Sequence, residues 1–242
     1  MIKLIAISAI IALPLVANAA DMPNTTLSQP LTSTPPIYSW TGFYVGLYAG
    51  GMFQGGNLNL ATTTGDDAAI NPHLAGSSFI GGGLLGYNYQ MGATVVGVEG
   101  DIGFNNAKST VVSANPAYSL SEWYANNTLT EHITGHVRAR LGWASGPMLI
   151  YSSAGVALSG VKVDVVGICG SPPYYYGTGS HERVGMSLGA GAEYALTHTV
   201  ILRGEYIYDN YGRQSVDVGS GWQNRKINAQ NQTMRTGISY KF

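Results

Sequence analysis

Hydrophobic and polar residues alternate with a period of two along most of residues 40–242. This period predicts β-strands, because successive side chains of a strand point to opposite faces. In the run 185–196, Met186 and Leu188 share one face, whereas Glu193 lies on the other. Runs of this kind occupy residues 42–49, 79–90, 94–104, 133–143, 149–158, 185–196, 200–208 and the last residues up to Phe242. Their lengths are close to the roughly 9–11 residues that a tilted strand needs to cross a bilayer.

The segments between these runs are alternately long and short. The short ones lie near residues 91–93, 145–148 and 197–199, and the long ones near 54–78, 105–132, 159–184 and 209–231. Outer-membrane barrels have short turns on the periplasmic side and longer loops outside. We therefore predict an all-β fold, an eight-stranded antiparallel transmembrane β-barrel with short periplasmic turns and four long outer loops.

The short turns also predict how neighbouring strands pair, because directly opposed residues of an antiparallel hairpin face the same side. A turn centred on His198 places Glu193 opposite Arg203 and Tyr194 opposite Leu202. The other two hairpins give the pairs Trp143–Ile150, Arg140–Ser153, Tyr87–Val96 and Leu84–Glu99. A one-residue slip in any of these hairpins would turn every side chain to the other face.

Charged residues within the expected strands all lie on the face opposite the apolar one. They are Glu99, Asp101, Arg138, Arg140, Glu193, Arg203, Glu205, Arg235 and Lys241. An Arg or Lys that faces lipid at the bilayer midplane costs about 2–4 kcal/mol, so these groups are expected inside the barrel. Without Lys241, these residues are four carboxylates and four guanidiniums. Their charges balance, and they predict a network that fills the narrow interior. A soluble barrel or β-sandwich is the alternative, but it would place apolar residues inside.

Aromatic residues gather near both ends of the expected strands. Near the short turns are Trp40, Phe43, Tyr89, Trp143, Tyr194, Tyr240 and Phe242, and near the long loops are Phe79, Phe104, Tyr206 and Tyr208. Two such bands predict the aromatic girdles that mark the two membrane–water interfaces.

The N-terminus predicts export from the cytoplasm. A positive start and an apolar run at 4–16 precede Ala17 and Ala19, which match a small-x-small cleavage site. The expected organisation is a signal peptide at 1–19, a Pro/Ser/Thr-rich periplasmic linker at 20–40 and the barrel at 41–242. Only 10% of the residues are charged and the formal net charge is −1, so nothing indicates a nucleic-acid partner.

Five motifs of the chain are Trp40–Gly46, Leu85–Gln90, Val98–Asp101, Val137–Trp143 and Gly189–Tyr194. Together they resemble the small outer-membrane immunogenic proteins of alpha-class bacteria, within the OmpA-like group of barrels. The last eight residues, with Gly237, Tyr240 and Phe242, resemble the C-terminal signal that the barrel-assembly machinery recognises. The resemblance implies an outer-membrane location, contacts with its lipid and with that machinery, and a structural or surface-antigen role without a cofactor.

Other functions depend on residues expected in or beside the long loops. His73, His132 and His181, with Tyr174, Tyr175 and Tyr176, leave hemin binding as an alternative, and a narrow low-conductance pore is another. Ser180, His181 and Glu182 have the residue types of a catalytic triad, but consecutive residues do not converge on one point, so no enzyme is expected. Cys169 is expected in the third long loop as a single thiol, and no metal-ligand spacing is present. The sequence does not name a host or ligand contact of the loops.

Overall fold

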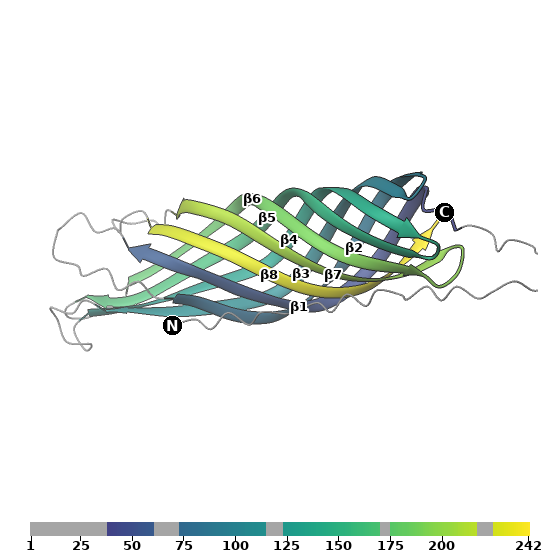
Figure 1. Ribbon diagram of the computed structural model, residues 1–242. Coiled ribbons are helices and arrows are strands. Elements are labelled where there is room, and N and C mark those ends of the chain that lie inside the picture. Colours follow the sequence, from purple (N-terminus) through teal and green to yellow (C-terminus); the bar gives the residue numbers. More distant parts are fainter. Residues whose placement is uncertain (1–37, 61–72, 115–122, 170–174, 217–224) are drawn as a thin grey trace, which may run out of the picture. The chain divides into compact units, whose positions relative to one another are not determined.

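The chain forms a closed barrel of eight antiparallel strands (Figure 1), described by a computed structural model over residues 38–60, 73–114, 123–169, 175–216 and 225–242. The strands are β1 (Gly42–Leu60), β2 (His73–Met91), β3 (Thr94–Ala114), β4 (Trp123–Ser145), β5 (Met148–Cys169), β6 (Tyr175–Ala195), β7 (Val200–Val216) and β8 (Arg225–Lys241). Each strand pairs with its neighbours in the sequence, and β1 pairs with β8 to close the sheet. No helix within these ranges is long and apolar enough to cross a membrane. The expected signal peptide, with Ala17 and Ala19, lies outside the described residues.

The short turns lie where the sequence predicts them. Met91 pairs with Thr94 and Ser145 pairs with Met148, so each of these hairpins turns on two residues. The first residue of each turn is a glycine with a positive φ, +62° at Gly92. A side chain strongly disfavours this conformation, which explains the glycine.

The predicted pairing is confirmed at two of the three hairpins. Glu193 lies opposite Arg203 in β6 and β7, and the two pairs predicted for β4 and β5 are also present. The prediction for β2 and β3 is wrong by two residues, since Glu99 lies opposite Gly86 and not opposite Leu84. The turn falls one residue further along the chain than assumed. A shift of two keeps every side chain on its predicted face, so the alternation could not reveal the error.

The strands extend further from the short turns than the alternation predicts. They contain between 17 and 23 residues, so much of the four expected outer loops is strand. β4, for example, begins at Trp123 and β3 continues to Ala114. The apolar alternation ends where the outward side chains leave lipid, but backbone hydrogen bonds continue the sheet beyond that level. The pattern therefore marks only the membrane-crossing part of each strand.

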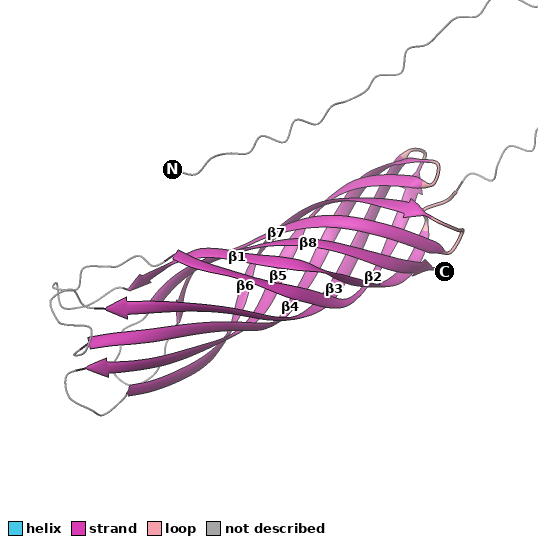
Figure 2. Cartoon of the chain, turned by 90° about the horizontal axis from the view of Figure 1, so that it is seen from below, coloured by secondary structure: helices cyan, strands magenta, loops and turns pink. Residues whose placement is uncertain are grey.

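Many large apolar residues of the strands are exposed on the outward face, as an outer-membrane barrel requires. Figure 2 shows the closed barrel of strands that carries this face. Exposed aromatic residues form the two expected bands, with Phe43, Tyr89, Trp143, Tyr194, Tyr240 and Phe242 near the short turns and Phe79, Phe104 and Tyr206 towards the other end. From Phe43 to Phe53, outward residues of β1, a strand tilted by about 45° rises roughly 24 Å. This height matches the apolar band of about 25 Å on outer-membrane barrels.

Candidate functional site in the barrel interior

Eight charged residues from five strands form the centre of the interior, and we call them the interior charge network. They are Glu99, Asp101, Arg138, Arg140, Glu193, Arg203, Glu205 and Arg235, and none is more than 7% exposed. Each belongs to the inward-facing set of its strand, because outward residues such as Val98 and Val137 alternate with them. The structure thus brings together all eight residues that the sequence assigned to the interior.

Arg138 lies at the centre of the network. Its guanidinium donates to Glu205 Oε1 at 2.8 Å, and to Glu99 Oε1 and Asp101 Oδ2 at 3.0 Å each. Arg235, on β8, lies 2.7 Å from Glu205 Oε2 and 3.1 Å from Asp101 Oδ2. Carboxylates from β3 and β7 are therefore held by guanidiniums from β4 and β8. Two of these charge-assisted contacts, Arg138 with Glu205 and Arg235 with Asp101, cross the interior between strands that are not neighbours in the sheet.

Towards the periplasmic end, Arg140 and Arg203 both contact Glu193 and Glu99. Arg140 Nη2 donates to Glu193 Oε1 at 2.6 Å, and Arg203 Nη2 donates to Glu99 Oε2 at 2.8 Å. Arg203 also pairs with Glu193, the residue directly opposite it on β6. Tyr44 completes this layer by donating its hydroxyl to Glu99 Oε2 at 2.8 Å.

Two of the guanidiniums also lie over inward-facing tyrosine rings. Arg140 is 3.8 Å from the ring centroid of Tyr151, and Arg235 is 4.0 Å from that of Tyr48. A cation over a desolvated aromatic ring gains about 2 kcal/mol. Tyr44 and Tyr48 are even-numbered residues of β1, which the sequence placed on the face opposite its apolar residues. They supply part of the packing around the charges.

His136 and Asp209 extend the network outward, and the sequence did not assign either of them to it. His136 Nδ1 lies 2.8 Å from Asp101 Oδ1, and Nε2 lies 3.1 Å from Asp209 Oδ2. Both ring nitrogens lie within hydrogen-bond distance of carboxylate oxygens, so a protonated imidazole would donate to both. With His136 protonated, the centre of the barrel holds five carboxylates, four guanidiniums and one imidazolium, whose charges balance.

A second polar layer lies further from the periplasm. Glu131 accepts a hydrogen bond from Gln54 Nε2 at 2.7 Å and one from Asn231 Nδ2 at 3.1 Å. Arg183 is 3% exposed and lies 5.7 Å from the ring centroid of Tyr211. The sequence placed all five residues in loops. Continuing the inward alternation of β6 and β7 past the last apolar residue would have found Arg183 and Tyr211.

Two aromatic residues that precede β1, Tyr38 and Trp40, pack inside the periplasmic mouth of the barrel. Trp40 is 1% exposed and packs in a cluster with Tyr38, Val95, Leu149, Tyr151, Ala144, Ala195 and Ile201. Its backbone N–H donates to Gln90 Oε1 at 2.7 Å and its indole N–H to Gly146 O at 3.3 Å. The prediction that Trp40 belongs to the lipid-facing girdle is therefore wrong, and the expected linker at 20–40 ends with residues that pack inside the barrel.

Tyr38 and Lys241 tie the two ends of the barrel chain together at this mouth. Burial, and then the nearby Glu193 carboxylate, raise the pKa of the Tyr38 hydroxyl to about 12, so it stays neutral. The Lys241 ammonium donates to Ser39 O at 2.5 Å and lies 5.0 Å from the Tyr38 ring centroid. Lys241 is thus half-buried at the rim, outside the charge network.

The residues of the expected assembly signal lie in and just after β8. Gly237 faces inward against β1, where an added Cβ would lie 2.7 Å from Leu47 O. Tyr240 and Phe242 face outward, and their rings meet edge to face with centroids 5.2 Å apart. The C-terminal aromatic side chains are therefore exposed on the membrane side of the strand that closes the barrel.

The described residues among those considered for hemin binding or catalysis, and Cys169, lie in strands and not within the long loops. His73 begins β2, His132 lies at an irregularity in β4, and Cys169 ends β5. Ser180, His181 and Glu182 are consecutive in β6, as are Tyr175 and Tyr176 nearer its start, whereas Tyr174 lies outside the described residues. Consecutive strand residues point to opposite faces, so these three cannot converge. Across the described ranges, no three His, Cys, Asp or Glu residues form a group that could hold a metal ion.

A closed antiparallel barrel with an apolar exterior and a polar interior is typical of integral outer-membrane β-barrel proteins. Residues 26–242 match the family model described as outer membrane protein beta-barrel domain. The chain therefore belongs to this family, and its location is the outer membrane.

Its relatives carry names that agree with this assignment. The chain is 29% identical to the 31 kDa outer-membrane immunogenic protein of Brucella melitensis, over 93% of each sequence. It is 32% identical to the 25 kDa outer-membrane immunogenic protein of Brucella abortus, over 86% of this chain and 81% of the relative. Among solved structures, Neisserial surface protein A is similar at a TM-score of 0.43 and 16% identity, over 84% of this chain and 98% of that one.

Proposed function

We propose that this protein is a closed structural barrel of the outer membrane, which supports the envelope and presents its outer segments at the cell surface, without catalysis and without passing solutes. The relatives named as immunogenic outer-membrane proteins support the surface role, because an antigen has to be reached from outside. The observation that supports the closed barrel is the set of buried side chains that pack against one another inside it.

The interior is occupied at three levels by side chains of different chemistry. The aromatic cluster around Trp40 covers the periplasmic mouth, the interior charge network fills the centre, and the layer around Glu131 lies beyond it. An eight-stranded barrel has an interior just wide enough for side chains to fill. Opening a path would require breaking several buried ion pairs, and each costs about 3–5 kcal/mol when one partner is removed.

The test is the electrical conductance of the folded protein in planar bilayers. The folded fraction is measured in the same preparation from the difference in gel mobility between boiled and unboiled samples, so that a silent bilayer does not merely reflect unfolded chain. We expect no steady unitary current from a preparation that is mostly folded. Steady unitary currents would overturn the closed barrel and favour the narrow pore.

A matched opened variant makes the silent result informative. Arg140→Ser with Glu193→Ser removes both members of a 2.6 Å ion pair and keeps the charge balance, and Trp40→Ala removes the largest side chain at the mouth. The triple variant, once shown to fold by the same mobility assay, should conduct more than the wild type. Equal conductance of the two proteins would show that these side chains do not close the barrel.

The envelope role needs a separate measurement in cells. A strain without the protein should release more periplasmic protein and become more sensitive to detergent, and the wild-type chain should reverse both effects. An envelope that is unchanged in the deletion strain would contradict the structural role.

A further inference from the structure

One guanidinium inside the barrel stands apart from the interior charge network. Arg183 is 3% exposed and belongs to the inward-facing set of β6, between the exposed residues Glu182 and Val184. Across the ranges that the structure describes, no carboxylate forms an ion pair with it, and its Nη2 atom has no hydrogen-bond partner. A buried charge is costly unless an opposite charge or several hydrogen bonds compensate it. Arg183 is therefore a candidate for binding a ligand of negative charge.

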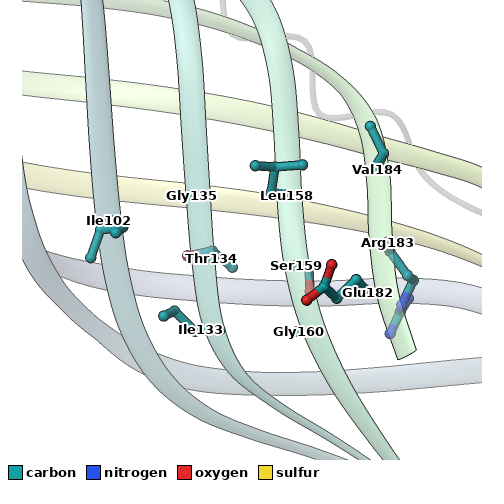
Figure 3. Close-up of a pocket in the computed structure, with 10 residues that line it drawn as sticks. All are labelled: Ile102, Ile133, Thr134, Gly135, Leu158, Ser159, Gly160, Glu182, Arg183 and Val184. Carbon is teal, nitrogen blue, oxygen red and sulfur yellow. The ribbon is translucent and has the colours of Figure 1, made fainter. Parts of the chain in front are cut away.

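Three hydroxyl groups near Arg183 also have no hydrogen-bond partner. Ser159 lies directly opposite Arg183 on β5, and Thr134 lies opposite Ser159 on β4 (Figure 3). Tyr211, on β7, has its ring centroid 5.7 Å from the guanidinium carbon of Arg183. The Ser159 hydroxyl is close to Tyr211, but neither makes an aligned hydrogen bond. Directly opposed residues have Cβ atoms about 4.5–5.5 Å apart, so these four groups share one small region of the interior.

The carboxylate of this layer is directed to other partners. Both oxygens of Glu131 accept hydrogen bonds from Asn231, and Oε2 also accepts one from Gln54. Burial raises the pKa of the Glu131 carboxyl, which favours its neutral form. Burial lowers the pKa of Arg183 too, but a guanidinium stays protonated in proteins. With Glu131 neutral, the layer carries a positive charge at Arg183 and hydrogen-bond donors around it.

The chemistry of these groups fits an anion better than water. A guanidinium and three hydroxyls can all donate, and an anion accepts from each of them while it also balances the buried charge. Val161, the next inward residue of β5, is 3% exposed, so the layer is shielded from bulk water. An ion there loses its hydration shell, at a cost that rises with the square of its charge. A small monovalent anion meets these conditions better than sulfate or phosphate.

The site lies where two neighbouring strands stop pairing. The pairing of β6 with β7 ends at Met186 and Asn210, although both strands continue outward along their other neighbours. Arg183 and Tyr211 lie just beyond that last pair, one on each strand. An ion that accepts hydrogen bonds from both strands would hold them together where the backbone ladder no longer does.

We propose that the layer around Arg183 binds one monovalent anion of the size of chloride. Arg183 Nη2 and the hydroxyls of Ser159 and Thr134 donate to the ion, and the Tyr211 hydroxyl completes the set of donors. The ion balances the guanidinium and stabilises the outer end of the barrel. This role goes beyond the closed structural barrel proposed above and leaves it unchanged, because the ion stays bound inside.

The first experiment compares the stability of the folded protein in sodium chloride and in sodium gluconate at equal ionic strength. Unfolding by urea in the presence of lipid vesicles is followed by tryptophan fluorescence, since guanidinium chloride would itself supply the ion. With a dissociation constant of about 10 mM, about 100 mM chloride raises the folding equilibrium constant by about tenfold. Equal stability in the two salts would overturn the proposal.

Three variants, each shown to fold by its gel mobility, place the ion. Arg183→Gln removes the charge and should abolish the difference between the two salts. Thr134→Val keeps the shape of the side chain and removes one donor, so we expect chloride to bind about fivefold more weakly. Lys162→Gln is the matched control, since it removes a cation whose side chain is 52% exposed, and it should keep the full difference.

A general effect of the salts on folding would persist in Arg183→Gln, and that result would overturn the site. Should Arg183→Gln not fold, unchanged chloride binding by Thr134→Val would overturn the site in its place.

A second measurement locates the ion directly. In crystals of the wild-type protein grown with bromide in place of chloride, anomalous scattering at the bromine edge should give a peak next to Arg183 Nη2. Bromide has the charge and nearly the size of chloride, so it should occupy the same site. A water molecule in that position, without an anomalous peak, would overturn the anion.

Discussion

Replacing Arg138 by Met tests whether the interior charge network stabilises the barrel. The change removes a guanidinium that contacts three buried carboxylates and keeps most of its apolar stem. Removing one member of a buried ion pair costs about 3–5 kcal/mol, because the other charge remains in a medium of low dielectric constant. Glu99 still contacts Arg203, and Glu205 still contacts Arg235. We therefore expect the lower end of that range, about 3 kcal/mol.

The assay is equilibrium unfolding by guanidinium chloride in the presence of lipid vesicles, followed by tryptophan fluorescence. A loss of about 3 kcal/mol lowers the folding equilibrium constant by roughly 150-fold. Lys162→Met is the matched control, since it removes a cation whose single pair, with Asp164, is exposed on the outside of the barrel. That change should cost no more than about 1 kcal/mol.

A double variant shows whether the loss comes from the unpaired carboxylates. Glu205→Gln removes the nearest of the three charges, whose Oε1 lies 2.8 Å from Arg138 Nη1. Combined with Arg138→Met it should recover part of the stability, with a coupling energy of about 0.5–3 kcal/mol. The reasoning is refuted if Arg138→Met costs no more than Lys162→Met, or if the two interior changes are simply additive.

Three further predictions concern the outside, the end and the mouth of the barrel. Leu188→Arg, on the lipid-facing surface of β6, should lose about 2–4 kcal/mol and reach the cell surface at a lower level than Leu188→Phe, and equal surface levels would contradict the facing of β6. Deletion of Phe242 should slow insertion into the outer membrane, and a pulse–chase measurement with normal kinetics would exclude its role in an assembly signal. Trp40→Ala should lower the free energy of unfolding by about 3–5 kcal/mol, and a change below 1 kcal/mol in the vesicle assay would show that the mouth does not depend on this ring.

Most of the barrel could be predicted because its two faces lie in different environments, lipid outside and polar side chains inside. Lipid selects apolar residues outside and the narrow interior accepts polar ones, so the facing of Leu188 and of Glu193 follows from the alternation alone. The register across β2 and β3 could not be fixed in the same way. A shift of two residues leaves every face unchanged, and only the choice of Gly92 as the first turn residue, with its positive φ, decides between the two registers.

The candidate site could be predicted only as far as the lipid-facing pattern extends. Glu131 and Arg183 lie beyond the runs of alternating residues that predict their strands, which begin at Ile133 and Gly185. An irregularity between Glu131 and Ile133 also changes the count, so that Glu131 and Thr134, three positions apart, are both buried. A bulge of this kind reverses the facing of every residue beyond it, and strict alternation carried past it assigns the wrong side.

Trp40 shows a different limit of the sequence. An aromatic residue next to a periplasmic turn suits a girdle and suits the mouth of the barrel equally well, because both places combine apolar packing with a nearby polar partner. The structure decides between them through contacts distant in the sequence: the indole donates to Gly146 O, and the backbone N–H donates to Gln90. No local pattern around Trp40 carries that information.

The net charge of the barrel centre distinguishes a structural role from ion passage only when Asp209 and His136, which the sequence did not assign to the interior network, are counted. The eight residues assigned from the sequence are neutral together, so the additional carboxylate of Asp209 would leave one net negative charge in the centre of the barrel. A protonated His136, which would donate to both Asp101 and Asp209, balances that charge. A centre without net charge has no excess charge that would favour the entry of ions of one sign into the barrel. This favours a structural role over ion passage, on grounds that do not depend on how tightly the interior is packed.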